Sequence, residues 1–87
     1  MVSGKAILSA PTGLHARPAG ELVKLVKSFT DSVVRIATPV RSVNAASMLS
    51  VLSLGIKSGT ELEISVEGGD EAAVFAAVKS FIESVTD

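Results

Sequence analysis

Apolar and polar residues alternate most clearly between Thr60 and Glu67, where Leu62, Ile64 and Val66 are separated by glutamate and serine. This period of two predicts a β-strand with one face in the core and the other in water. Shorter apolar or β-branched runs, bounded by turn-forming residues, predict further strands at Lys5–Ser9, Ser32–Thr38 and Arg41–Val43. The last two form a hairpin through Pro39.

Helical spacing of three and four marks the other segments. The helix predicted over Ala16–Phe29 has an apolar stripe of Ala19, Leu22, Val23, Val26 and Phe29. A short helix is predicted over Ser47–Gly55, with Asn44 as its cap and the glycine at its end. The last helix is capped by Asp70, begins near Glu71, and has an apolar stripe of Val74, Val78, Phe81, Ile82 and Val85.

The predicted order is therefore β-α-β-β-α-β-α. An antiparallel sheet that is polar on one side must cover its other side with helices. We expect an α+β fold, an open-faced β-sandwich of a four-stranded antiparallel sheet with three helices on one face. Ferredoxin-like folds share part of this order and bind unrelated ligands, so the fold alone assigns no function.

Composition narrows the classes of function. The chain of 87 residues is 47% apolar and 20% charged, which predicts one globular domain over residues 1–87. Without cysteine and with one histidine, it offers no disulfide and no cysteine or multi-histidine metal site. The lack of Trp and Tyr and a net charge of -1 argue against nucleic-acid binding. No segment resembles a signal peptide or a membrane span, which predicts a cytoplasmic protein.

The only histidine, His15, stands where a loop changes into the first predicted helix. The first N–H groups of a helix carry partial positive charge and bind phosphate oxygens. Pro18 suits the first helical turn, and Gly13 frees the backbone just before the histidine. A neutral imidazole is nucleophilic without an activating base, and the Arg17 guanidinium can bind an arriving anion. A phosphohistidine and a plain anion-binding loop both fit this arrangement, as does an ordinary surface pair of histidine and arginine.

Two motifs resemble those of one family. Gly13-Leu14-His15-Ala16-Arg17-Pro18-Ala19 is similar to the active-site signature of HPr, the histidine-containing phosphocarrier protein of the bacterial phosphoenolpyruvate-dependent sugar phosphotransferase system. The segment Val43–Ile56 resembles the second signature of that family, and the order of elements agrees with its fold. The resemblance covers nearly the whole chain.

The resemblance implies a phosphocarrier rather than a stand-alone catalyst. His15 would accept a phosphoryl group on Nδ1 from the phosphohistidine of enzyme I and pass it to the A component of a sugar permease, without a cofactor. Arg17 would neutralise the phosphate, within a phosphate-binding loop and helix start formed by Gly13, Ala16, Arg17 and Pro18.

Ser47 matches a position that an ATP-dependent kinase phosphorylates in many Gram-positive relatives. The resemblance thus adds HPr kinase/phosphorylase and a catabolite-control transcription regulator as partners. The plain alternative is that Ser47 only caps the short helix. Two departures stand out, because Ala46 replaces the lysine of many regulated members, and the connection 38–41 lacks a common glycine and is one residue longer.

A docking surface is expected where the first two helices present side chains to solvent. A helix as short as 47–55 cannot bury every apolar residue in so small a domain. With a basic rim from the first helix, its residues would suit transient docking of a monomer on acidic protein partners. The residues expected there are Gly20, Lys24, Lys27, Met48, Leu49 and Leu52. The lysines alone would equally suit a solvated helix face.

Other functions remain open at this stage. A paralogue could serve a nitrogen-related phosphorelay or another phosphoenolpyruvate-linked enzyme. A regulatory module could keep the Ser47 switch without carrying phosphate, although such relatives typically lack the histidine. A ferredoxin-like nucleic-acid binder conflicts with the missing aromatic residues.

Overall fold

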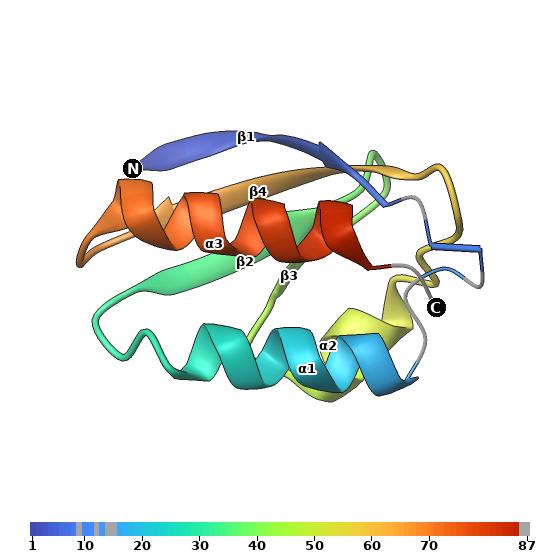
Figure 1. Ribbon diagram of the computed structural model, residues 1–87, viewed down its shortest axis with the longest axis horizontal. Helices are drawn as coiled ribbons and strands as arrows, with labels where there is room; N and C mark the ends of the chain where they lie inside the picture. The colour runs from blue at the N-terminus through green and yellow to red at the C-terminus, as the bar shows by residue number, and fades with distance from the viewer. Residues whose placement is uncertain (9, 12, 14–15, 86–87) are drawn as a thin grey trace.

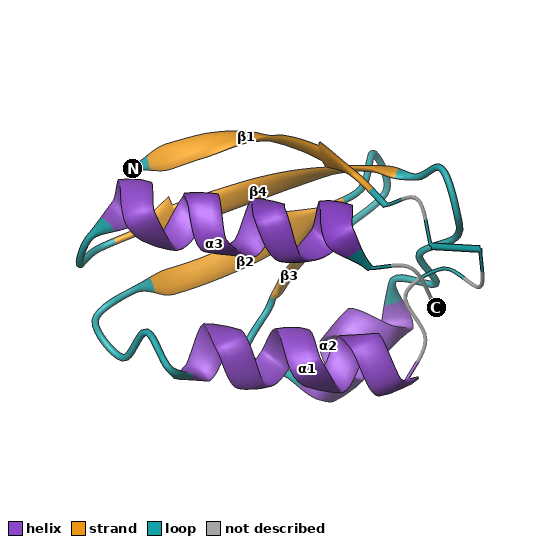
Figure 2. Cartoon of the chain, in the orientation of Figure 1, coloured by secondary structure: helices purple, strands orange, loops and turns teal. Residues whose placement is uncertain are grey.

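Four strands form one antiparallel sheet in the order β1-β4-β2-β3 (Figure 2). A computed structural model describes residues 1–8, 10–11, 13 and 16–85. The strands are β1 (Val2–Ile7), β2 (Val33–Ala37), β3 (Ser42–Asn44) and β4 (Glu61–Glu67), and the helices are α1 (Ala16–Lys27), α2 (Met48–Ser53) and α3 (Glu71–Ser84). This β-α-β-β-α-β-α order confirms the predicted fold.

The last strand in the chain lies inside the sheet. Ile64 of β4 is opposite Gly4 of β1 on one side and Ile36 of β2 on the other, and all three pairings along the sheet are antiparallel. The period of two then sends one set of side chains to a single face. That set is buried and comprises Ala6, Val34, Ile36, Val43, Leu62, Ile64 and Val66.

The helices cover this apolar face (Figure 1). Helix α3 packs on β1 and β4, and α1 contacts both α3 and α2. Their buried stripes match the predicted ones, except that Phe29 and Phe81 are only partly buried. The opposite face of the sheet carries exposed polar residues such as Lys5, Glu61 and Glu63, as expected for an open-faced sandwich.

The first strand begins earlier than predicted. The prediction was Lys5–Ser9, whereas β1 spans Val2–Ile7, and residue 9 lies outside the described residues. Pairing of Val2 with Val66 extends the strand backwards through a serine and a glycine, which favour strands poorly by themselves. Within this part of the chain, Ala6 and Leu8 are both buried.

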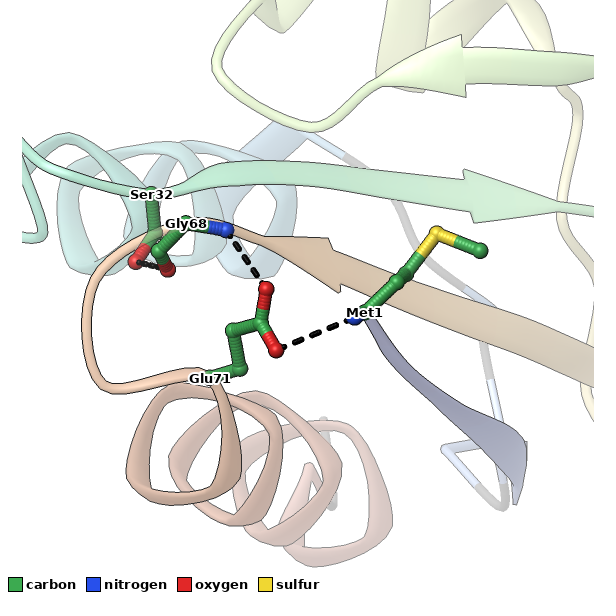
Figure 3. Close-up of polar contacts among 4 residues, drawn as sticks. All are labelled: Met1, Ser32, Gly68 and Glu71. Carbon is green, nitrogen blue, oxygen red and sulfur yellow. Dashed lines mark hydrogen bonds and ion pairs between the residues drawn. The ribbon is translucent and has the colours of Figure 1, made fainter.

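The turn between β4 and α3 is held by a small polar cluster (Figure 3). The Ser32 hydroxyl donates to the Gly68 carbonyl at 2.7 Å, and the Gly68 N–H donates to Glu71 Oε2 at 2.8 Å. The other carboxylate oxygen of Glu71 lies 3.1 Å from the Met1 amine. The backbone hydrogen bond, and then the amine, lower the pKa of Glu71. Asp70 caps α3 as predicted, since its side chain accepts from the Ala73 N–H.

Candidate phosphoryl-transfer site and its docking surface

The segment before α1 packs against the segment after α2. Gly13 is buried, has a φ of +72°, and donates its N–H to the Ala10 carbonyl at 3.0 Å. A Cβ atom at Gly13 would collide with the Ile56 carbonyl oxygen and lie 3.0 Å from Lys57 Cα. The two segments that resemble family signatures therefore meet here, and only glycine fits the contact without strain.

The start of α1 has one face in the core and one in solvent. Pro18 and Ala19 are fully buried, whereas Ala16 and Arg17 are exposed. Pro18 tolerates this position because the first turn requires no intrahelical N–H donor. Two exposed residues, Ala16 and Arg17, thus lie at the positive end of the α1 dipole, which favours an anion.

His15 lies outside the described residues, together with Leu14 and Thr12. Its role as phosphoryl acceptor stays a prediction from the sequence. The structure describes its surroundings on both sides, namely the glycine turn that ends at Gly13 and the helix that begins at Ala16.

Ser47 is the N-cap of α2. Its backbone is extended, and its hydroxyl oxygen accepts from the Ser50 N–H at 3.3 Å. The prediction of Asn44 as the cap was wrong, because its side chain instead accepts from the Ala46 N–H at 2.8 Å, two residues on. Asparagine readily forms such a local turn, so the helix starts only at Met48. The capping role of Ser47 is observed, and its phosphorylation stays a prediction.

Replacing Ser47 by alanine is expected to lower the free energy of unfolding by about 1 kcal/mol, because the first turn of α2 loses its capping acceptor. Ser47→Asp should keep most of this stability, since a carboxylate also caps. The matched control is Ser53→Ala on the same helix, where the exposed hydroxyl only donates to the Ser50 carbonyl. Urea denaturation measures all three, and equal losses in Ser47→Ala and Ser53→Ala would contradict the capping argument.

Helix α2 directs only Val51 fully into the core. Leu49 is 81% exposed and Leu52 is 37% exposed, while Met48 is partly buried. Large apolar side chains rarely stay this exposed together without a partner. The expectation that part of this helix faces solvent is confirmed.

Helix α1 lies beside α2 and adds a basic margin (Figure 1). Lys24 and Lys27 are exposed, and Gly20 is partly exposed. The contact between the helices includes Gly20 and Met48, since a Cβ at Gly20 would lie 3.7 Å from Met48 Cε. We call the following six residues the α1–α2 surface: Gly20, Lys24, Lys27, Met48, Leu49 and Leu52.

Gly20→Ala is expected to stabilise the fold by about 0.5–1 kcal/mol, because alanine favours the helix and lowers the entropy of the unfolded chain. The added methyl group would make only ordinary van der Waals contact with the Met48 thioether. Thermal and urea unfolding measure the change. A loss of stability would show that Met48 cannot accommodate the methyl group.

Sequence reasoning missed the support that Ile56 and Lys57 give to Gly13. The signal was present in part, because a glycine just before the histidine suggested an unusual backbone, but its contact partner lies far along the chain. Within the described residues, no cluster of three acidic or histidine side chains could hold a metal ion. Nor does any described helix combine the length and apolar character needed to cross a membrane.

Comparison with known proteins decides the family. A family model described as the phosphotransferase system "HPr component phosphorylation site" matches residues 2–84. The chain belongs to the HPr family. Membership assigns it the phosphocarrier role of that system, in agreement with the resemblance of its two signature segments.

Individual relatives agree with this assignment. Phosphocarrier protein HPr of Mycoplasma capricolum is 35% identical over 79 residues, which cover 91% of this chain and 88% of the relative. The crystal structure of HPr from Thermoanaerobacter tengcongensis superposes with a TM-score of 0.90 at 34% identity, covering 97% and 93% of the two chains. Crh of Bacillus subtilis gives a TM-score of 0.77 at 31% identity, and the match covers 100% of this chain and 99% of Crh. The structure of Crh is described as a domain-swapped dimer.

Proposed function

We propose that His15 accepts a phosphoryl group from phosphorylated enzyme I and passes it to the A component of a sugar permease. One observation carries the proposal: the only histidine of the chain directly precedes the exposed N-terminal end of α1, within a family model for a phosphorylation site. The protein is then a carrier between two partners rather than a catalyst by itself.

The chemistry requires little of the carrier. A neutral ring nitrogen of His15 attacks phosphorus, and its new P–N bond replaces the P–N bond to the histidine of enzyme I. A proton on the other ring nitrogen of that histidine lets it leave as a neutral imidazole, and phosphorylated His15 then releases its own ring proton to solvent. The phosphoryl oxygens are bound by the Arg17 guanidinium and the positive end of α1. Transfer onward reverses these steps on the second partner, which supplies the remaining positioning.

The test is direct. The purified protein is mixed with enzyme I, phosphoenolpyruvate and Mg²⁺, and one acid-labile phosphate per chain is expected on a peptide that contains His15. Addition of an A component should then discharge it. Absence of acid-labile phosphate from the intact, folded protein would refute the proposal.

The α1–α2 surface is the proposed docking site for both partners. Its exposed leucines form an apolar centre and its lysines a basic margin, which fits transient contact with an acidic protein surface. Because both partners would dock on the same surface, the carrier can bind only one of them at a time. Docking beside the start of α1 would bring each partner's active group to His15.

Leu49→Asp is expected to weaken binding to enzyme I about tenfold or more, because a carboxylate would replace an apolar contact and face an acidic partner. Stability should change by less than about 0.5 kcal/mol, since the side chain is exposed. Titration calorimetry or the concentration dependence of transfer measures the affinity. Val40→Asp is the control, because Val40 is 86% exposed but lies in the β2–β3 loop. Equal effects of both substitutions would exclude a specific role for Leu49.

Regulation at Ser47 is a second proposal, favoured by its place as the N-cap of α2, next to Met48 and Leu49. A phosphate there is stabilised by the start of a helix and adds about two negative charges beside a surface meant for acidic partners. HPr kinase/phosphorylase and a catabolite-control transcription regulator are the proposed partners of this form. Incubation with such a kinase and ATP, followed by mass spectrometry, tests it, and an unmodified Ser47 would refute it.

We further propose that the protein acts as a cytoplasmic monomer with protein partners and no nucleic-acid partner. The aliphatic composition and the net charge of -1 support this. The domain-swapped dimer described for Crh makes the oligomeric state worth measuring, and light scattering after size exclusion should give the mass of one chain.

A further inference from the structure

Met48 links the two helices of the α1–α2 surface. It is the first residue of α2, is partly buried, and is followed directly by the exposed Leu49. Its thioether lies over α1 at Gly20, where Met48 Cε and Sδ would be 3.7 and 3.9 Å from a Cβ atom. Among the described residues, these two atoms are the only ones within 4 Å of that position outside α1 itself and the chain neighbours of Gly20. The sulfur therefore borders a place on α1 that carries no side chain.

No side chain at position 20 covers the side of the sulfur that faces α1. A thioether is oxidised through its sulfur lone pairs, so access of a small oxidant to that atom determines the rate. Gly20 is itself partly exposed, and it places only backbone beside the thioether. Any larger side chain at position 20 would cover part of the sulfur, whereas glycine leaves that side open to a molecule as small as hydrogen peroxide.

We propose that Met48 is a reversible oxidation site through which hydroperoxides weaken docking of this carrier. The sulfur lone pair attacks one peroxide oxygen, the O–O bond breaks, and an S–O bond forms. The proton of the transferred oxygen moves to the other oxygen. With hydrogen peroxide as the oxidant, this second oxygen leaves as water. Sulfur is oxidised by two electrons to the sulfoxide, and the peroxide is reduced by two.

The consequence for docking follows from polarity and rests on the proposed function of the α1–α2 surface. A sulfoxide places a strong hydrogen-bond acceptor within the α1–α2 surface, on the residue that precedes the exposed Leu49. When a partner binds, the sulfoxide oxygen would be buried without a hydrogen-bond donor, and this reduces the free energy of binding. The fold should tolerate the change, because Met48 as a residue is only partly buried.

The first measurement maps oxidation without using activity. The folded protein is treated with hydrogen peroxide for a series of times and digested, and peptides that gain one oxygen atom are quantified. Met1 is 77% exposed and serves as an internal reference for an accessible methionine. Met48 should be oxidised within the same series, more slowly than the more exposed Met1, and more slowly still in Gly20→Ala, whose methyl group would cover one side of the sulfur. If Met48 stays reduced while Met1 is consumed, the proposal is overturned.

The second measurement determines the affinity for enzyme I from the concentration dependence of phosphoryl transfer. For each variant, the result is the ratio of this affinity before peroxide treatment to that after it. Treated wild type is expected to bind enzyme I about tenfold more weakly, as for loss of one well-packed apolar contact. Met48→Leu should show a ratio near one, although its Met1 is oxidised as in wild type. Methionine sulfoxide reductases with a thiol reductant should restore the treated wild type.

The outcomes separate the two proposals. A sulfoxide at Met48 with an unchanged ratio overturns the docking effect, as does an equal loss in treated Met48→Leu. Circular dichroism of the treated protein must remain that of the folded chain, because unfolding on oxidation would also overturn a docking effect. If untreated wild type accepts no phosphoryl group, the proposed function is refuted. The oxidation of Met48 is then still tested independently by the peptide masses.

Discussion

Replacing His15 by alanine is expected to abolish phosphoryl acceptance, lowering the rate of transfer from enzyme I by at least about a thousandfold. The chain has no second histidine and no cysteine. A serine or threonine hydroxyl would need an activating base to attack phosphorus, and an ammonium group has no free lone pair for the attack. No other side chain can therefore take over the neutral nucleophile. Acid-labile phosphate after incubation with enzyme I and phosphoenolpyruvate is the measurement.

Arg17→Ala provides the matched comparison, because it changes the neighbouring side chain that would bind the phosphoryl oxygens. This variant should still be phosphorylated, but more slowly, since the nucleophile remains and one charge-assisted contact is lost. Arg17→Ala should unfold at nearly the wild-type temperature, because Arg17 is exposed and its loss leaves the core intact. Acid-labile phosphate that persists in His15→Ala would show that another residue is the acceptor.

Gly13→Ala should be the most destabilising of the glycine substitutions considered, with a loss of about 2–4 kcal/mol in the free energy of unfolding. Two costs combine at this position. A φ of +72° is unfavourable for alanine, and the methyl group would collide with the Ile56 carbonyl oxygen. The neighbour is backbone rather than a flexible side chain, so relief requires the segments around 13 and 56 to separate.

Gly55→Ala isolates the first cost. Gly55 follows the last turn of α2 with a φ of +60°, and nothing lies within 4 Å of the position its Cβ would take. We expect a loss of about 1 kcal/mol from backbone strain alone. Urea denaturation compares the two variants, and equal losses would mean that the contact with Ile56 contributes nothing. Gly13→Ala should also slow transfer to His15, because the segment that leads into α1 would shift.

Several elements could be predicted from the sequence because their signals are local. The alternation of Leu62, Ile64 and Val66 places one face of β4 in the core whatever it pairs with, and the spacing of Val74 and Val78 does the same for α3. Both predictions were confirmed. The Asp70 cap was also predicted correctly, because capping involves only the next few residues.

Sequence-based prediction failed where two nearby residues could both cap a helix, and where pairing with another strand set the start of a strand. Asn44 and Ser47 are both good caps by residue type, and the choice between them depended on how Asn44 turns towards the Ala46 N–H after leaving β3. The early start of β1 was decided by β4, which offers Val2 a partner in Val66. Neither outcome is encoded in the residues beside it.

For the site, the sequence by itself determined the residues that bear the chemistry: a lone histidine, a nearby arginine, and a helix of which part must face solvent. Only the tertiary structure decided that Gly13 rests on Ile56 and that Gly20 lies against Met48. Periodicity determines which face of a helix or strand is apolar. Contacts between residues far apart in the chain depend instead on how the helices pack on the sheet and against each other.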